Sequence, residues 1–180
     1  MTQISLIENP GGKTQEVFES LEKNLGMVPN IFKALANSPA ALDAYLAFNQ
    51  ALSAGKLCPM LKEKIALTVA GVNSCNYCAS AHTALGLGLS IEKDELKKNI
   101  EAKSDCEKTE AALQFAKAIV VKHGRDLDSE FKAVEEAGFS HGEIVEVIAV
   151  VSVNIFTNYF NHIAGTEVDF PLVQVQAAKV

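Results

Sequence analysis

Two cysteines, a histidine and a glutamate occur at spacings that suit thiol redox chemistry. Cys75 and Cys78 form a Cys-x-x-Cys pair, with His82 four residues after it and Glu63 twelve residues before it. On one helix, Cys75, Cys78 and His82 fall at positions i, i+3 and i+7 and therefore share a face. Cysteines three residues apart on a helix have Cα atoms roughly 5 Å apart, which is within the disulfide range. The pair can therefore open and close without refolding.

The helix that carries this pair should favour a reactive thiolate. We expect Ser74 to be its N-cap residue and the helix to run from Cys75 to Leu87. A cysteine in the first turn feels the positive end of the helix dipole, which stabilises a thiolate relative to a thiol. His82 lies one turn below Cys78 and is placed to accept its proton.

Glu63 is expected to contact His82 across a helical hairpin. Residues 57–72 form a helix that is apolar almost all round, which indicates burial. The connection at residues 72–74 is short, so the next helix should fold back antiparallel to the first. Glu63 lies ten residues before Asn73 and His82 nine residues after it, which sets the two side chains opposite each other. The spacing thus predicts a relay of carboxylate, imidazole and thiol.

Each member of this group also has a simpler interpretation. Glu63 stands in a first helical turn, where glutamate is ordinary helix-dipole chemistry, and His82 could be a hydrogen-bonded core histidine. Cys75, Cys78 and His82 would supply three zinc ligands, but no second Cys-x-x-Cys or His-x-x-x-His follows to complete a structural site. Ala79 rather than histidine follows Cys78, which argues against haem attachment.

Residues 20–171 resemble a known family of helical proteins in three stretches. The order of glutamate, eleven residues, Cys-x-x-Cys, three residues and histidine resembles the alkyl hydroperoxidase D (AhpD) and carboxymuconolactone decarboxylase-like superfamily. Residues 25–32 and 36–39 are similar to the N-terminal part of its peroxidase-related branch. Residues 154–162 and 169–171 are similar to the C-terminal part of that branch.

The resemblance implies an all-α fold. We expect a single compact helical domain of about seven to nine helices, with the Cys-x-x-Cys site on a helical hairpin. The predicted domains are a loosely held N-terminal segment, residues 1–12, and an AhpD-like helical domain, residues 13–180. The family also implies a homo-oligomer, whether dimer, trimer or hexamer.

The resemblance further implies an oxidoreductase that reduces hydroperoxides. Cys78 would be the thiol that peroxide oxidises, and Cys75 would be the more exposed, resolving thiol. Glu63 and His82 would form the proton relay. No metal or other cofactor is expected, and the partners would be a hydroperoxide substrate and an external dithiol reductant.

The chain departs from the family at one position. The hydroperoxidase D enzymes carry a second histidine between the two cysteines, and Tyr77 stands there in this sequence. Tyr77 could offer a hydroxyl to the relay, or it could merely cover the site. The decarboxylases of the superfamily lack the dithiol, so lactone decarboxylation is not carried over to this chain.

A second set of polar residues lies near the C-terminus. We expect a long apolar helix from His141 to Ala164, which starts with a capping box at Ser140. The seam along its second half comprises Asn154, Asn158, Asn161 and His162. These side chains either satisfy loop carbonyl groups or line the approach to the dithiol. We therefore treat Asn154, Asn158, His162 and Tyr77 as candidates for a supporting role.

The remaining cysteines are expected to be structural. Cys58 should be a small buried residue at the entry of the Glu63 helix. Cys106 lies in a predicted capping box, residues 104–107, that starts a helix through Lys122. Between these helices, Ser90 should cap a helix whose polar face includes residues 92–98.

Composition and charge narrow the classes of function. The 180 residues are 48% apolar, which is enough for one domain with a sizeable core. The net charge is −6, from 16 basic and 22 acidic residues, and no basic stripe suits nucleic acid. No apolar run approaches the roughly 20 residues of a membrane span, and no signal region opens the chain, so we expect a cytoplasmic protein without membrane partners. In such a chain, four cysteines argue for thiol chemistry.

Three functions follow from this sequence. The first is a thiol-dependent peroxidase that uses Cys75 and Cys78, assisted by Glu63 and His82. The second is a non-catalytic redox-sensing or scaffold module of the same fold, whose disulfide state changes partner binding or assembly. The third is a metal-dependent lyase or decarboxylase that acts on a small acid.

Overall fold

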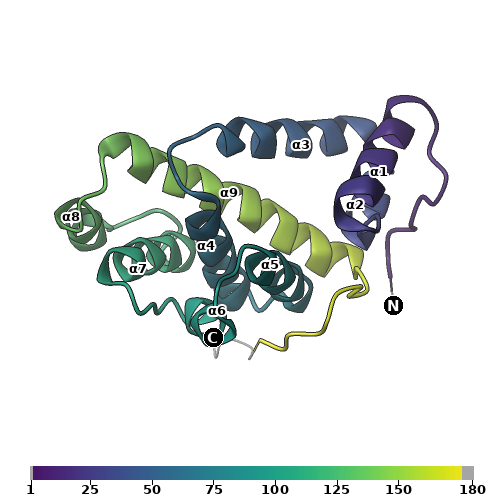
Figure 1. The fold of residues 1–180 in the computed structure, drawn as a ribbon. Coiled ribbons are helices and arrows are strands. Elements are labelled where there is room, and N and C mark those ends of the chain that lie inside the picture. Colours follow the sequence, from purple (N-terminus) through teal and green to yellow (C-terminus); the bar gives the residue numbers. More distant parts are fainter. Residues whose placement is uncertain (1, 176–180) are drawn as a thin grey trace.

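The all-α fold is confirmed. The chain was analysed as a computed structural model that describes residues 2–175, and these residues form nine α-helices and no strand (Figure 1). The helices are α1 (Gly12–Leu25), α2 (Asn30–Leu35), α3 (Pro39–Ser53), α4 (Pro59–Val72), α5 (Asn76–Gly88), α6 (Lys93–Ile100), α7 (Glu107–Val121), α8 (Asp128–Glu136) and α9 (His141–Ala164). Ahead of α1, the amides of Gln3 and Ile7 donate hydrogen bonds to the carbonyl groups of Ala164 and Lys33. The domain boundary at residue 12 stays a prediction.

Helix α4 is the element around which the others pack. In Figure 1, α9 runs diagonally across the molecule and α4 lies beneath it, between α7 and α5. Every side chain from Ile65 to Ala70 is at most 2% exposed, as the apolar pattern predicted. Because neighbours cover α4 on most sides, the position of Glu63 near its N-terminus is fixed by the whole bundle.

The dithiol belongs to a different hydrophobic cluster from most of α4. One cluster joins α4, α7, α8 and α9, and Phe115 and Val151 are among its buried members. A second cluster joins α1, α2, α3 and α5 with the segment after α9, and it contains both Cys75 and Cys78. The two cysteines are therefore packed among apolar side chains at one end of the molecule.

Capping residues define several helix termini, and the capping box predicted at the start of α9 is confirmed. Ser38 caps α3 by accepting a hydrogen bond from the amide of Ala41, and Pro39 follows at the first helical position. Ser140 and Glu143 form the predicted capping box at the start of α9. Gly26 ends α1 in the left-handed conformation, with φ of 74°.

Glu95 and its neighbours correct the prediction for α6 and α7. Glu95 was placed on a solvated polar face, but it is buried and accepts hydrogen bonds from Lys64 Nζ at 2.7 Å and Ser104 Oγ at 2.6 Å. Asn99 and the amide of Asp105 donate to the same carboxylate. Burial would raise the pKa of Glu95, but these donors lower it to about 2. Ser104 is thus committed to Glu95 and does not form the predicted capping box.

Ser90, Cys58 and Cys106 also differ from the predictions. Ser90 has φ of 62° and precedes α6 in a left-handed turn, and Glu92 takes the N-cap position instead. Cys58 and Cys106 were expected to be structural, with Cys58 buried, yet both thiols are exposed. Each of these cysteines is the N-cap residue of its helix, α4 or α7, and forms no side-chain cap hydrogen bond. Both of these N-cap positions lie at the surface, which overrides the usual preference of cysteine for burial.

Helix α9 has the predicted bounds but also an uncovered apolar side. Its 24 residues are long and apolar enough to cross a membrane by length and composition alone, which corrects the expectation that no apolar segment approaches the length of a membrane span. Of the apolar window of this helix, 44% is buried within the protein. The exposed apolar side chains of α9, called here the α9 stripe, are Val145, Ile148, Phe156, Tyr159 and Ile163.

Gly71 allows α4 to approach α6 closely, which gives a test of the packing. A Cβ atom at Gly71 would collide with the backbone oxygen of Ile100. We expect Gly71→Ala to lower the free energy of unfolding by about 1–3 kcal/mol, because backbone cannot move aside as a side chain can. Urea unfolding would measure this loss.

Gly88 provides the matched control for that substitution. It lies at the last position of α5, and a Cβ atom there would meet nothing within 4 Å. Gly88→Ala should therefore be neutral, or stabilise the fold by about 0.5–1 kcal/mol through helix propensity. Equal effects of the two substitutions would show that α4 and α6 are not in close contact.

Candidate active site

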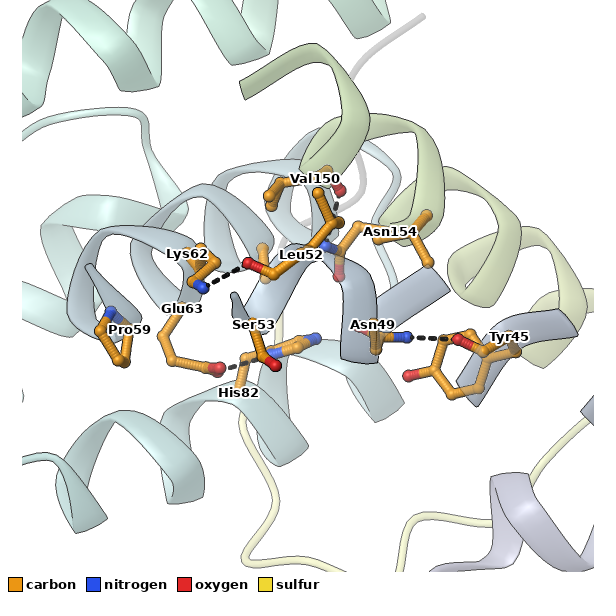
Figure 2. A pocket seen from close by; sticks show the side chains of 12 residues that line it. Tyr45, Asn49, Leu52, Ser53, Pro59, Lys62, Glu63, His82, Val150 and Asn154 are labelled. Carbon is orange, nitrogen blue, oxygen red and sulfur yellow. Dashed lines mark hydrogen bonds and ion pairs between the residues drawn. The ribbon is translucent and has the colours of Figure 1, made fainter. Parts of the chain in front are cut away.

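The α4–α5 hairpin brings Glu63 and His82 together, as their distances from the turn predicted. Glu63 Oε2 lies 2.7 Å from His82 Nδ1, and the two side chains are 20% and 21% exposed (Figure 2). With the carboxylate ionised, the Nδ1–H group donates to it, which leaves Nε2 available on the other side of the ring. The carboxylate–imidazole contact of the predicted relay is present, whereas the step from imidazole to thiol and the catalytic role stay predictions.

Helix α9 holds the turn of this hairpin. Asn73 Nδ2 donates to Asn158 Oδ1 at 3.1 Å, and His162 Nε2 donates to the carbonyl oxygen of Asn73 at 2.9 Å. His162 is exposed and is used on this loop carbonyl, which favours the structural interpretation of that residue. Two residues of the polar seam on α9 therefore hold the α4–α5 connection in place through hydrogen bonds.

Cys75, not Ser74, caps the dithiol helix. Ser74 adopts a left-handed conformation with φ of 56°, and α5 begins one residue later than predicted, at Asn76. Cys75 is the N-cap residue, and its Sγ accepts a hydrogen bond from the amide of Cys78 at 3.3 Å. The predicted thiolate stabilisation by the helix N-terminus is therefore directed at Cys75.

The two sulfur atoms form a tightly coupled pair. They are unbonded and lie 2.6 Å apart. The contact with Cys78 lowers the pKa of Cys75 despite its burial, with help from the amide of Cys78 and from His82. The same contact, together with burial, raises the pKa of Cys78. When the pair has lost one proton, its negative charge therefore resides mainly on Cys75.

An apolar cavity gives access to Cys78. It has a volume of about 250 Å³. Its walls are formed by Leu25, Pro29, Ile31, Phe32, Tyr45, Tyr77, Cys78, Ala81, His82, Leu85, Thr157, Asn161 and Phe170. Cys75 is not among these lining residues, and at 2% exposure it is as buried as Cys78 at 3%. The predicted greater exposure of Cys75 is thus wrong, because its side chain caps the helix instead of facing the cavity.

A second cavity of about 250 Å³ lies on the carboxylate side of the same histidine. Figure 2 shows Glu63, His82 and Asn154 on its walls, with Lys62 bonded to the carbonyl group of Leu52 at its rim. Tyr45 and His82 line both cavities. These two side chains therefore separate an apolar space at the sulfur from a more polar space at the carboxylate.

Charge compensation keeps His82 basic. Burial disfavours the imidazolium form, but the charge of Glu63 and its hydrogen bond outweigh burial and raise the pKa of His82. Cys75 and Asn154 add to this effect. Asn154 Nδ2 donates to the carbonyl oxygen of Val150 at 2.9 Å, which holds its side chain beside the histidine. Asn154 is thus placed to support His82.

Tyr77 anchors helices instead of extending the relay. Its hydroxyl accepts a hydrogen bond from the amide of Ile31 at 3.1 Å, and its ring meets Phe170 edge to face at 5.9 Å. Burial raises the pKa of Tyr77, so the hydroxyl stays protonated. Of the two interpretations of Tyr77, the structure favours a side chain that covers the site.

Two residues near the sulfurs were missing from the set predicted from the sequence. Asn161 Nδ2 donates to Cys78 Sγ at 3.2 Å. The polar seam named Asn161, but nothing in the pattern distinguished it from its neighbours. Tyr45 has no place in the predicted site, although burial, Cys78 and Glu63 together raise its pKa to about 12. No sequence signal marks a tyrosine on a separate helix as part of this site.

The structure offers no cluster for the zinc interpretation. In the part of the chain that is described, no group of three or more histidine, cysteine, aspartate or glutamate side chains is arranged to hold a metal ion. His82 Nδ1 is hydrogen-bonded to Glu63, and the two sulfur atoms contact each other, so these groups are not arranged around a common metal position.

Replacing Glu63 tests the electrostatics of this site. Without the carboxylate, burial dominates, so Glu63→Gln should move the pKa of His82 below its usual value of about 6.5. The raised pKa of His82 contributes stability that is fully present below the unfolded value and is lost as pH rises through the folded value. Glu63→Gln should therefore cost about 1–3 kcal/mol at mildly acidic pH and less at alkaline pH. NMR titration of the ring and urea unfolding at both pH values would measure these effects.

The exposed His141 is an internal control for this titration. Its Nε2 lies 2.7 Å from Glu135 Oε1, far along the chain from Glu63, and its ring signals should be the same in the variant and the parent protein. A His82 titration unchanged by Glu63→Gln would contradict the proposed electrostatic coupling.

Comparisons with known proteins agree with this fold. The sequence model of the carboxymuconolactone decarboxylase family matches residues 39–120, and no curated protein matches the chain. An uncharacterised peroxidase-related protein from Silicibacter sp. TM1040 is 24% identical and superposes with a TM-score of 0.80 over 93% of this chain and 94% of that one.

Two further solved structures are similar at comparable identity. An uncharacterised peroxidase-related protein with an AhpD core, from Ralstonia eutropha JMP134, is 21% identical, with a TM-score of 0.81 over 92% of this chain and 93% of that one. The debrominase Bmp8 in its apo form is 22% identical, with a TM-score of 0.81 over 94% and 93% of the two chains. The family model thus matches residues 39–120 of this chain, and the superpositions show that the chain has the AhpD-like fold.

Proposed function

We propose that this protein is a thiol-dependent peroxidase that reduces hydroperoxides through a dithiol–disulfide cycle of Cys75 and Cys78. The observation that carries the proposal is the pair of unbonded sulfurs 2.6 Å apart, one of them on the wall of a cavity that also contains His82. The peroxidase-related names of two structural neighbours are consistent with this chemistry.

The first step oxidises Cys78. Its proton passes to the Cys75 thiolate across the short contact, and the Cys78 thiolate attacks the terminal oxygen of the hydroperoxide. An S–O bond forms and the O–O bond breaks, which gives a sulfenic acid on Cys78 and an alkoxide. The imidazolium of His82, whose pKa is raised by Glu63, donates a proton to the alkoxide, and an alcohol leaves.

The second step closes the disulfide. Neutral His82 takes the proton from Cys75, whose thiolate attacks the Cys78 sulfur. The S–S bond forms as the S–O bond breaks, and the departing hydroxide takes the proton back from His82 to become water. The balance is one dithiol and one hydroperoxide converted to one disulfide, one alcohol and one water. An external dithiol then returns two electrons and two protons.

Substituting each cysteine tests this cycle. Cys78→Ser should abolish peroxide consumption, because it removes the sulfur that lines the cavity. Cys75→Ser should allow one oxidation and then stop, leaving a sulfenic acid on Cys78 that a dimedone adduct would reveal in a peptide map. Peroxide consumption and free thiols, followed in time, measure both effects.

Cys58 and Cys106 provide matched controls. Both are exposed N-cap residues outside the two cavities, so Cys58→Ser and Cys106→Ser should keep the activity of the parent protein. Wild-type turnover by Cys78→Ser, or loss of turnover in either control alone, would reject the assignment of the dithiol.

Redox-controlled assembly is the second candidate function. Helix α9 carries Asn158 and Asn161, which contact the hairpin turn and Cys78, and the same helix carries the exposed α9 stripe. A change at the dithiol can therefore reach a surface suited to a second copy of the chain. Under this hypothesis, light scattering would show different assembly masses for the reduced and oxidised protein, and peroxide would be consumed only once per dithiol.

A further inference from the structure

Two carboxamides of α9 lie at the sulfur of Cys78. Asn161 Nδ2 donates to Cys78 Sγ at 3.2 Å. Asn158 is fully buried, its Nδ2 has no hydrogen-bond partner among the described residues, and its side chain also lowers the pKa of Cys78. The two residues are three apart on one helix and therefore face the same way.

The charge of the dithiol has to move before Cys78 can attack. At rest the negative charge favours Cys75, which caps α5, whereas Cys78 is the sulfur on the wall of the apolar cavity. Cys78 is 3% exposed, so a thiolate formed there cannot rely on water. A buried anion requires donors from the protein, and N–H donors to an anion form strong hydrogen bonds.

The bonding of Asn161 indicates a role beyond packing. In the described part of the chain, the one hydrogen bond of its carboxamide goes to Cys78, and its buried Oδ1 has no partner. A purely structural buried amide is expected to satisfy its oxygen as well. Asn158, by contrast, uses Oδ1 to hold Asn73, and its buried Nδ2 has no partner in the described part of the chain, so this amide group can donate to a thiolate on Cys78.

We propose that Asn158 and Asn161 form an amide cradle that stabilises the thiolate of Cys78 and so selects Cys78 as the attacking sulfur. As the Cys78 proton moves to Cys75, the two N–H groups compensate the charge that appears on Cys78. Both asparagines are positioning residues, since they act through the sulfur. The choice of attacking sulfur rests on the proposed peroxidase function, whereas stabilisation of the thiolate does not require peroxide.

A thiol titration isolates this effect. In a background of Cys58→Ser, Cys75→Ser and Cys106→Ser, Cys78 is the sole thiol of a chain that has four cysteines. Asn161→Leu should move the titration midpoint of Cys78 to higher pH and slow its alkylation by iodoacetamide near neutral pH by about tenfold. The ultraviolet absorbance of the thiolate and the alkylation rate, each measured against pH, are the readouts.

Asn158→Asp is an independent second variant. It keeps the oxygen that accepts from Asn73 and replaces the amide near Cys78 with a carboxylate. Because the new carboxylate repels a thiolate, the titration midpoint of Cys78 should lie at higher pH in this variant than in the background protein. If Asn161→Leu does not fold, Asn158→Asp still tests whether the asparagines stabilise the thiolate of Cys78.

Thr68→Val is the matched control for the loss of a buried hydrogen bond. The hydroxyl of Thr68, on α4, donates to the carbonyl oxygen of Asn99 at 2.7 Å, and neither residue contacts the sulfurs. This variant should leave the Cys78 titration unchanged. A midpoint in Asn161→Leu and Asn158→Asp equal to that of the background would overturn the cradle. Absence of peroxide turnover in the parent protein would instead reject the peroxidase function, because the titration uses no peroxide.

Discussion

The site depends on one contact, the hydrogen bond between Glu63 and His82 across the α4–α5 hairpin. A carboxylate and an imidazole that are each about one-fifth exposed compensate one another, so neither charge stands alone in a packed interior. The contact also fixes the orientation of the ring of His82, which lines the cavity that contains Cys78. Most of the bundle serves to hold α4 and α5 at the separation this contact requires.

The hairpin could be predicted because it depends on short-range counting. A short turn and two helices leave one register in which residues at nearly equal distances from Asn73 face each other, and Glu63 and His82, ten and nine residues away, are in that register. Helix α9 and its capping box were predicted for the same reason, since caps and apolar periodicity are local features. The family resemblance extended this local prediction to the whole fold.

Other features depend on contacts between helices or on a shift of a single residue. The left-handed conformation of Ser74 delays the start of α5 by one residue, which converts Cys75 from a helical residue to a cap. Burial of Glu95 required Lys64 from another helix, and a single-helix pattern does not contain that partner. Asn161 and His162 are neighbours in sequence, yet a rotation of about 100° per residue sends one to Cys78 and the other to the surface.

The wall formed by Tyr45 and His82 gives the imidazole two separate neighbourhoods. A substrate molecule in the apolar cavity at Cys78 does not have to leave for protons to enter or leave through the more polar cavity beside Glu63. Substrate exchange and proton exchange can then use different cavities, and the imidazole ring is the group that links the two.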